Sequence, residues 1–185
     1  MKKACFLDRD GVLIVDKNYL HDVSQVELEP GAAEAVRLLN RNGYQVVVVS
    51  NQSGVARGYF TEAKVREVNQ YIHRLLEADG ARIDGWYFCP HHPKGTVPEY
   101  TVKCDCRKPE PGLLLRAAKE LDLDLQASYM IGDKVSDVEV GNRAGCRAGI
   151  LVMTGQAEDI PVDQRKHLRY IADNLLEAVK LLLKS

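Results

Sequence analysis

The sequence FLDRDG at residues 6–11 decides how the rest of the chain is interpreted. It completes an apolar segment, Ala4 to Leu7, that is typical of a buried strand. Asp8 and Asp10 therefore stand two residues apart at the end of a strand, where both carboxylates can reach one metal ion and one substrate atom. The pattern is short, and the alternative is an Asx-type turn in which the carboxylates only bond backbone amides. The remaining sequence has to separate these two interpretations.

Strand and helix signals alternate along the chain after this turn. Strands are predicted at residues 44–50, 86–88, 129–131 and 149–152, and helices at 30–43, 61–80, 111–121, 136–144 and 174–183. Pro30 is expected at the first helical position, Gly43 and Gly80 at helix ends, and Thr61 and Asp173 as N-caps. The four valines at 46–49 suit a parallel strand covered on both faces. We therefore predict a Rossmann-like α/β fold, a three-layer parallel sheet in a single domain over residues 1–185.

Composition and charge limit the possible partners. With 45% hydrophobic and 28% charged residues the chain is typical of soluble globular proteins. Its 25 Lys and Arg nearly balance 26 Asp and Glu, so neither nucleic acid nor an anionic membrane is an expected partner. The apolar run near the N-terminus stops at Asp8, and no stretch approaches the roughly 20 apolar residues of a membrane span. We expect a cytoplasmic protein with reduced thiols, acting as a monomer.

Polar residues gather where the predicted strands end. In open α/β sheets the ligand lies outside the carboxyl ends of the strands. The second strand leads into residues 50–54 (SNQSG), and the fourth leads into Asp133 and Lys134, with Asp137 shortly after. Lys108 precedes a proline just ahead of a predicted helix, a position that attracts phosphate. These placements predict one polar site at one edge of the sheet.

The residue types at this edge suit phosphoryl transfer. Asp8 would be the attacking carboxylate, and Asp10 the acid and base. Asp8 and Asp133, with Asp137 as a further acidic group, suit a hard Mg²⁺ ion. Ser50 and Lys108 would donate to the phosphoryl oxygens. Each has a structural alternative, because Ser50 can cap the next segment, Lys108 can be a solvated charge and Asp133 can belong to a Gly-Asp turn.

A second cluster of ligand types lies in an irregular segment, residues 89–107. Its prolines and weak periodicity predict a long loop, and it contains three thiols and an imidazole: Cys89, His91, Cys104 and Cys106. This set suits a structural zinc ion that folds the loop, with His92 as an alternative to His91. Cys5 and Cys146 have apolar or small neighbours and are predicted to be packing residues.

These motifs, taken in order, resemble those of the haloacid dehalogenase-like (HAD-like) phosphohydrolases. The matching pieces are DRDG at 8–11, SN at 50–51, KP at 108–109 and GD at 132–133 with Asp137. The stretches 50–58, 89–93 and 104–109 look like one branch, the D-glycero-D-manno-heptose-1,7-bisphosphate 7-phosphatases. The similarity runs from about residue 4 to about residue 155. The large inserted cap of many HAD-like proteins is missing here, so the resemblance implies a capless phosphatase that selects its substrate with loops.

The resemblance implies roles for individual residues. Asp8 would be the nucleophile that forms a covalent aspartyl phosphate, Asp10 the general acid and base, and Ser50 and Lys108 the groups that stabilise the phosphoryl group. Mg²⁺ would be held by Asp8, Asp133 and the backbone carbonyl of Asp10. The sugar bisphosphate would contact Asp16, Tyr19, Ser50, Asn51, Gln52, Ser53, Arg107, Lys108 and Lys134. Zinc would be held by Cys89, His91, Cys104 and Cys106.

The expected function is hydrolysis of the 7-phosphate of D-glycero-D-manno-heptose 1,7-bisphosphate, leaving the 1-phosphate, in nucleotide-activated heptose biosynthesis. One alternative is a histidinol-phosphate phosphatase, whose branch also has a zinc loop. The longer gap between His91 and Cys104, and Arg107 beside Lys108, favour the heptose enzyme. The other alternative is a non-catalytic module whose zinc loop binds a partner, which leaves Asp8 and Lys108 without a role.

Overall fold

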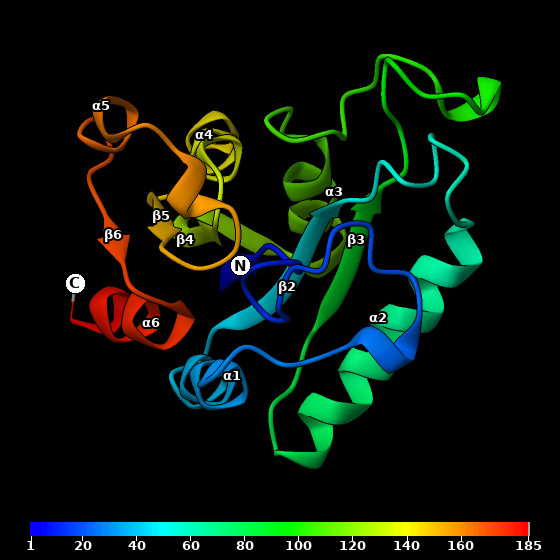
Figure 1. The fold of residues 1–185 in the computed structure, drawn as a ribbon. Helices are drawn as coiled ribbons and strands as arrows, with labels where there is room; N and C mark the ends of the chain where they lie inside the picture. Colours follow the sequence, from blue (N-terminus) through cyan, green and yellow to red (C-terminus); the bar gives the residue numbers. More distant parts are fainter. Residues whose placement is uncertain (185) are drawn as a thin grey trace.

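The computed structural model describes residues 1–184, which form one parallel sheet with helices on both faces (Figure 1). The strands are β1 (Lys2–Leu7), β2 (Gln45–Asn51), β3 (Gly85–Cys89), β4 (Leu123–Gly132), β5 (Ala148–Val152) and β6 (Ile171–Ala172). Their order is β3-β2-β1-β4-β5-β6, and every neighbouring pair is parallel. The predicted three-layer α/β fold is confirmed.

The central strands supply both hydrophobic cores because their side chains alternate between the two faces. Cys5, Val46 and Val48 belong to the core beneath α1 (Ala32–Arg41), α2 (Glu62–Ala78) and α6 (Leu175–Leu183). Val47 and Val49 belong to the opposite core, beneath α3 (Gly112–Leu121) and α4 (Val135–Ala144). The run of four valines is therefore buried on both sides, as the sequence predicts.

The ends of the helices match the sequence signals in part. Thr61 caps α2, since its side chain accepts a hydrogen bond from Lys64 N at 3.3 Å. Pro30 is not at the first helical position, because Gly31, with a φ of 82°, is the N-cap of α1. Asp173 is not an N-cap either, because the adjacent Asn174 accepts from Glu177 N and begins α6.

Two further elements differ from the prediction. β4 begins at Leu123 rather than at residue 129, and its first residues pair with Lys2 and Lys3 before the register shifts. The two-residue strand β6 and the four-residue helix α5 (Val162–Arg165) were not predicted. None of the helices within residues 1–184 is both long enough and apolar enough to span a membrane.

The parallel arrangement brings the ends of β1, β2 and β4 to one edge of the sheet. The connections after these three strands therefore face each other, together with the long segment between β3 and α3 (Figure 1). All predicted polar motifs leave the sheet at this edge. The fold thus brings side chains that are far apart in the sequence close together at one edge of the sheet.

Candidate active site

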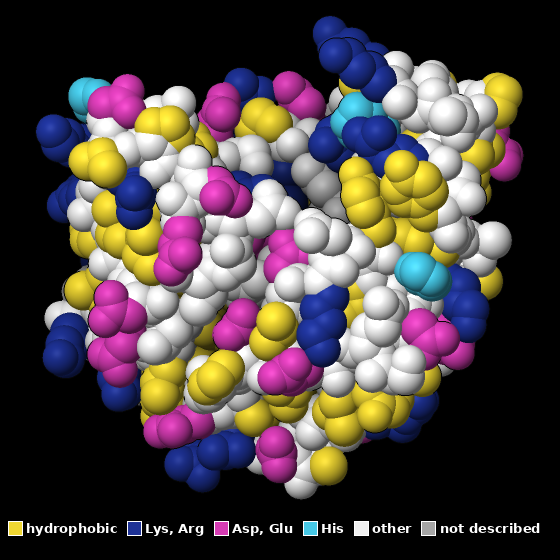
Figure 2. All heavy atoms as spheres, in the orientation of Figure 1, with side chains coloured by type: hydrophobic (Ala, Val, Ile, Leu, Met, Phe, Trp, Pro, Cys, Tyr) yellow, Lys and Arg dark blue, Asp and Glu magenta, His cyan; other side chains and the backbone are white. Residues whose placement is uncertain are grey.

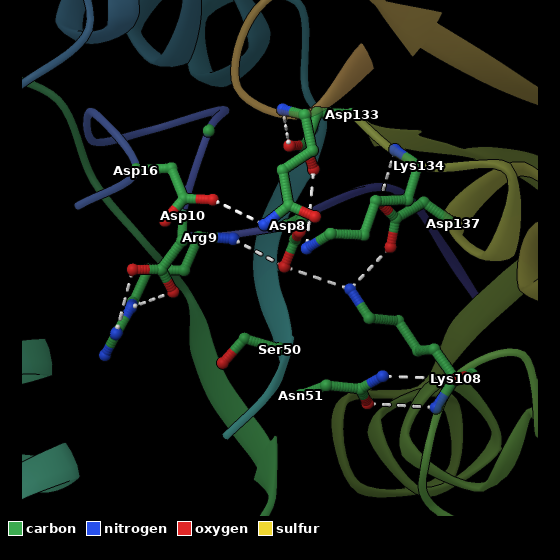
Figure 3. A network of polar contacts seen from close by, with 12 residues as sticks. Asp8, Arg9, Asp10, Asp16, Ser50, Asn51, Lys108, Asp133, Lys134 and Asp137 are labelled. Atoms are coloured by element: carbon green, nitrogen blue, oxygen red, sulfur yellow. Dashed lines mark hydrogen bonds and ion pairs between the residues drawn. The ribbon is translucent and has the colours of Figure 1, made fainter. Parts of the chain in front are cut away.

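Lys108 lies at the centre of the polar cluster, between two buried carboxylates (Figure 3). Its Nζ is 3.0 Å from Asp8 Oδ1 and 2.7 Å from Asp137 Oδ1, and it also donates to the carbonyl of Val49 at 2.9 Å. Burial would lower the pKa of Lys108, but Asp137 and Asp8 raise it above its ordinary value. Lys108 is therefore a fixed, permanently charged group, not a solvated lysine.

Asp8 follows β1 and is held from several sides. Burial alone would raise its pKa, but the charges of Lys108 and Lys134 and hydrogen bonds from Lys108 and the Arg9 amide keep the pKa below its ordinary value. The Arg9 amide donates to Asp8 Oδ1 at 2.9 Å, and the Asp8 amide donates to Ile131 O on β4. Asp8 is thus ionised and fixed at the base of the site.

Asp133, after β4, is the carboxylate that lacks compensation. It is fully buried, and its Oδ2 accepts from the Gln156 amide at 2.7 Å, whereas its Oδ1 has no hydrogen-bond partner. Lys134 Nζ is 4.0 Å from that Oδ1. Burial and the charge of Asp8 raise the pKa of Asp133 to about 8. A buried oxygen without a donor, beside other carboxylates within 4.8 Å, fits a hard divalent cation.

Asp137, on the first turn of α4, is paired with Lys108. Its Oδ1 faces Lys108, and its Oδ2 accepts from the Lys134 amide at 3.1 Å. Burial raises its pKa, against the opposing effect of the Lys108 charge. Asp137 therefore orients Lys108 and holds the turn that carries Lys134.

Asn51 at the end of β2 fixes the backbone of Lys108. Its Oδ1 accepts from the Lys108 amide at 3.0 Å, and its Nδ2 donates to the Lys108 carbonyl at 3.1 Å. Because both groups of the side-chain amide are used, the lysine cannot shift along the chain without losing both bonds. Asn51 thus positions a residue 57 places away in the sequence.

Asp10 and Ser50 are joined by Gln52. Gln52 Nε2 donates to Asp10 Oδ2 at 3.0 Å and to Ser50 Oγ at 3.2 Å. Arg9 contacts both oxygens of the Asp10 carboxylate, at 2.9 and 3.1 Å. In Figure 3 this Arg9–Asp10 pair lies to the left of Asp8, whereas Lys108 and Asp137 lie to its right. The two aspartates of the DRDG motif therefore have different surroundings.

A cavity of about 490 Å³ opens above these residues. Figure 2 shows it as a hollow at the top of the view, with Lys and Arg side chains at its base and rim. Its lining contains predicted site residues from all the motifs: Asp8, Asp10, Asp16, Tyr19, Asn51, Gln52, Ser53, Arg107, Lys108, Lys134 and Asp137. Ser50 is buried and is not part of this lining, and its Oγ accepts a hydrogen bond from Gln52, which is. The predicted substrate-binding residues thus lie together around one space.

One wall of the cavity is the loop of residues 16–20. Asn18 and Tyr19 both have left-handed φ angles, 50° and 54°, and the Asn18 amide donates to Asp16 Oδ1. Tyr19 packs edge-on against Tyr59, with ring centroids 4.9 Å apart. Gln156 Nε2 donates to the other Asp16 oxygen at 2.8 Å. The loop is therefore fixed from both sides.

The Cys/His cluster lies beside this site. The three sulfurs are 2.9 to 3.6 Å apart, and His91 Nδ1 is 3.3 Å from Cys106 Sγ and 3.7 Å from Cys89 Sγ. All three thiols are free, and the four potential ligand atoms lie within 4.8 Å of one another. Three thiols and an imidazole converging on one point are the donor set of a structural zinc site.

His91 and His92 have different positions. His91 belongs to the cluster, whereas His92 Nδ1 accepts from the Lys94 amide and its Nε2 is 3.5 Å from Arg57 Nη2. Arg107, next to Cys106, points its Nη1 toward the His91 carbonyl at 3.5 Å and also lines the cavity. The cluster and the cavity therefore share this segment.

The two remaining cysteines are structural. Cys5 is fully buried in the core under α1 and α2, and Cys146 packs against the core on the opposite face. Burial raises the pKa of the Cys146 thiol to about 12. The prediction that both are packing residues is confirmed.

Sequence reasoning missed three residues that shape the site. Gln156 contacts both Asp133 and Asp16, Thr154 Oγ1 donates to the Gly11 carbonyl at 2.6 Å, and Arg9 holds Asp10. The segment after β5 carries no recognisable motif, so Thr154 and Gln156 gave no signal. Arg9 was detectable, because an arginine directly behind a buried strand needs a buried partner.

Comparison with known proteins identifies relatives along the whole chain. A family model described as HAD-hydrolase-like matches residues 105–178. The D-glycero-beta-D-manno-heptose-1,7-bisphosphate 7-phosphatase of Pasteurella multocida (strain Pm70) is 43% identical over 182 residues, which cover 98% of this chain and 97% of that protein. The enzyme of the same name from Escherichia coli (strain K12) is 45% identical over 153 residues, 83% of this chain and 80% of its own length.

A solved structure agrees with these relatives. The crystal structure of D,D-heptose 1,7-bisphosphate phosphatase from B. bronchiseptica, complexed with magnesium and phosphate, superposes with a TM-score of 0.85. It is 31% identical in sequence, and the match covers 98% of both chains.

Proposed function

The chain belongs to the heptose-1,7-bisphosphate 7-phosphatases of the HAD-like family, and we propose that it removes the 7-phosphate of D-glycero-β-D-manno-heptose 1,7-bisphosphate and leaves the 1-phosphate. It is a phosphoric monoester hydrolase. The observation that carries this function is the 43% identity to a named enzyme over 98% of the chain, joined to a cavity lined by Asp8 and Lys108, with the buried Asp133 carboxylate within 4.8 Å of Asp8. The named relatives give no support to a histidinol-phosphate phosphatase, and a binding module would have no use for buried, paired charges.

We propose Asp8 as the nucleophile. A side-chain oxygen of Asp8 attacks phosphorus, the bond to the sugar oxygen breaks, and Asp10 gives its proton to that departing oxygen. A water molecule then attacks the aspartyl phosphate, Asp10 takes the water proton, and phosphate leaves with Asp8 restored. Support comes from the fixed, ionised state of Asp8, whose pKa is held low, and from the place of Asp10 in the same cavity.

Lys108 and Ser50 are proposed to stabilise the phosphoryl group as charge builds on its oxygens. Lys108 is already oriented by Asp137 and Asn51, so little reorganisation is required when substrate binds. Ser50 is kept in place by its bond with Gln52. Preorganised donors of this kind are usually the largest contribution to such catalysis.

Asp8, Asp133 and the Asp10 backbone carbonyl are proposed to hold magnesium. When bound, Mg²⁺ offsets the negative charge of the phosphoryl group and of the carboxylates. The unpartnered Oδ1 of Asp133 and its raised pKa support this assignment, since both are relieved by a cation. The nearby Lys134 is proposed to contact the substrate from the same turn.

Zinc is proposed as a second, structural metal, held by Cys89, His91, Cys104 and Cys106. When bound, it cross-links residues on both sides of a long loop. Arg107 and Lys108 follow Cys106 directly, so the bound ion would help to hold the backbone from which both side chains extend. We further propose that the protein acts as a cytoplasmic monomer on this small substrate, without nucleic-acid or membrane partners.

The distal phosphate of the substrate is assigned to Arg107. Residues proposed for chemistry account for the transferred phosphate only, and the planar guanidinium can bind a second phosphate with two hydrogen bonds. Asp16, Tyr19, Asn51, Gln52 and Ser53 complete the cavity wall around the sugar. We propose that cleavage then occurs at the 7-position because it is the primary and less hindered ester.

The experiment compares kcat/KM for both anomers of the heptose 1,7-bisphosphate, a sugar monophosphate and histidinol phosphate, with phosphorus NMR of the products. We expect the β-bisphosphate to be preferred and the anomeric phosphate to survive. Arg107→Ala should lower kcat/KM for the bisphosphate by about 1.5–3 kcal/mol, the range for a charged hydrogen bond, with a much smaller loss on the monophosphate. Prior loss of the anomeric phosphate, or equal losses on both substrates, would refute the assignment.

A further inference from the structure

Arg9 is the largest fully buried side chain of the described residues, yet the proposed chemistry gives it no part. Only 1% of its surface is exposed. Its Nε donates to Asp10 Oδ2 at 2.9 Å and its Nη2 to Asp10 Oδ1 at 3.1 Å. Its Nη1 donates to Asn69 Oδ1 at 3.0 Å, and its Nη2 also donates to Gln52 Oε1 at 3.3 Å. A buried guanidinium is costly unless it is paired in this way, so its position is closely defined.

These contacts fix the plane of the Asp10 carboxylate. Two parallel N–H···O bonds hold the carboxylate in the plane of the guanidinium. The guanidinium is itself held by Asn69, which lies on α2 and is 6% exposed. The anchor of Asp10 therefore lies on a helix 60 residues away from Arg9 in the sequence.

Gln52 contacts both Arg9 and Asp10, and all its hydrogen bonds are satisfied by a single orientation of its side-chain amide. Its oxygen accepts from Arg9, while its nitrogen donates to Asp10 Oδ2 and to Ser50 Oγ. Asp10 Oδ2 consequently accepts two hydrogen bonds, whereas Oδ1 accepts one, from Arg9. Oδ1 is the oxygen with spare capacity, and the Asp10 side chain is partly exposed to the cavity.

We propose that Arg9, anchored by Asn69, is a positioning residue that aims Asp10 Oδ1 at the reacting ester oxygen. The inference rests on the proposed role of Asp10 as acid and base. In the first step the Oδ1 proton passes to the sugar oxygen as its bond to phosphorus breaks and the Asp8–phosphorus bond forms. In the second step Oδ1 takes a proton from water as the water oxygen bonds to phosphorus and the Asp8–phosphorus bond breaks.

Leaving-group chemistry separates positioning from a merely structural role. A sugar alkoxide needs a proton to depart, whereas p-nitrophenolate does not. Misaligned Asp10 should therefore slow formation of the aspartyl phosphate from a sugar phosphate but not from p-nitrophenyl phosphate. General acid–base catalysis contributes about 10²- to 10⁴-fold, so partial misalignment should cost about tenfold or more.

The test uses Asn69→Leu, which is close in size and removes the acceptor of Arg9 while leaving every direct contact of Asp10. Single-turnover rates of leaving-group release, which report the first step alone, should fall about tenfold on the sugar bisphosphate and stay within about threefold on p-nitrophenyl phosphate. The loss should appear in the maximal rate at saturating enzyme and not in the concentration that gives half of that rate. Arg9→Lys keeps the charge without the two-pronged contact, and it should show the same difference if Asn69→Leu does not fold. His73→Phe is the matched control, since it removes a hydrogen bond from Trp86 one turn further along α2 and has no contact with Asp10.

Three outcomes decide the matter. The split between substrates in Asn69→Leu or Arg9→Lys, absent in His73→Phe, supports the proposal. Equal losses on both substrates, or a loss confined to the half-saturating concentration, overturns it. Asp10→Asn separates failure of this inference from failure of the proposed role of Asp10. If Asp10→Asn shows the difference between substrates and neither positioning variant does, only the positioning role of Arg9 fails. If Asp10→Asn shows no difference between substrates, the acid and base role of Asp10 is contradicted.

Discussion

The buried carboxylates and the Cys/His cluster both gather potential metal ligands within 4.8 Å, but they are held in place differently. Asp8 and Asp133 sit directly behind β1 and β4, and Asp137 lies on a helix that begins at the same edge of the sheet. Backbone amides, Lys108 and the ends of regular elements hold these carboxylates in place. Cys104 and Cys106, in contrast, lie in a loop of irregular structure between β3 and α3.

This difference indicates what each proposed metal ion would contribute. The sheet and helices preorganise the acidic site, so a cation there adds charge but not structure. The loop buries few apolar side chains, and the convergence of its four potential ligands ties residues 89–91 to residues 104–106. Loss of a ligand in the first region should therefore affect chemistry, and loss in the second should affect the fold of the loop.

The largest expected effect is on turnover, with Asp8→Asn. An amide cannot form the acyl phosphate, so activity should fall by at least about 10⁴-fold while the fold is retained. Phosphate release and circular dichroism measure both quantities, and Asp173→Asn, an exposed carboxylate outside the site, is the control. Substantial activity left in Asp8→Asn would exclude the covalent mechanism.

The second prediction concerns stability at the acidic site. Lys108→Met leaves Asp8 and Asp137 without their shared cation, which should cost about 3–5 kcal/mol of unfolding free energy. Lys134→Met is the control, because its ammonium is partly exposed and 4.0 Å from Asp133, and the expected loss is below about 1 kcal/mol. Urea unfolding of the zinc-loaded protein without added Mg²⁺ compares them. Equal losses of unfolding free energy in the two variants would show that the stabilisation by Lys108 does not depend on the burial of its ion pairs.

The third prediction tests the loop. Wild-type protein should contain one zinc per chain, and Cys104→Ser should lower zinc affinity by at least about 10- to 100-fold and make residues 89–107 sensitive to protease. Cys146→Ser, outside the cluster, should change neither. Stabilisation by added Mg²⁺ should persist in both variants. Wild-type protein that is folded and active without zinc would remove the distinction between the two regions.

The fold was predictable where a pattern is local. The valine run, the alternation of helix and strand and the DRDG, SN, KP and GD motifs placed the sheet and its reactive edge. The start of β4 was missed, because residues 123–128 (LDLQAS) mix polar and small residues of low β-propensity. β6 has only two residues and gives no periodicity at all. Element boundaries depended on which neighbour caps a helix, as at Asn174.

The sequence predicted the residues that we propose to carry the chemistry, but not the residues that hold them in place. Asp8, Lys108 and Asp133 were predicted because they are charged residues next to the ends of predicted strands or helices. Asn69 and Gln156 are ordinary polar residues whose importance comes from contacts across 60 and 23 positions of sequence. Such partners depend on packing of α2 and of the segment after β5, which no local signal encodes.

The smallest expected effect is on Tm, and removing a potential metal ligand should change Tm in opposite directions in the two regions. Asp133 is buried beside Asp8, and its raised pKa, about 8, means that its ionised form weakens the metal-free fold above the unfolded pKa of roughly 3.9. Asp133→Asn removes that charge, so in the zinc-loaded protein without Mg²⁺ at pH 8 it should raise Tm by a few degrees, which is about 1 kcal/mol for a chain of this size. The gain should shrink as the pH falls toward the unfolded pKa and vanish below it, where both states of the wild type are protonated, and Mg²⁺ should no longer stabilise the variant. Removing the Asp133 ligand should therefore stabilise the protein without Mg²⁺, whereas Cys104→Ser should not stabilise the loop under any condition. A lower Tm for Asp133→Asn than for the wild type at pH 8 would contradict this account.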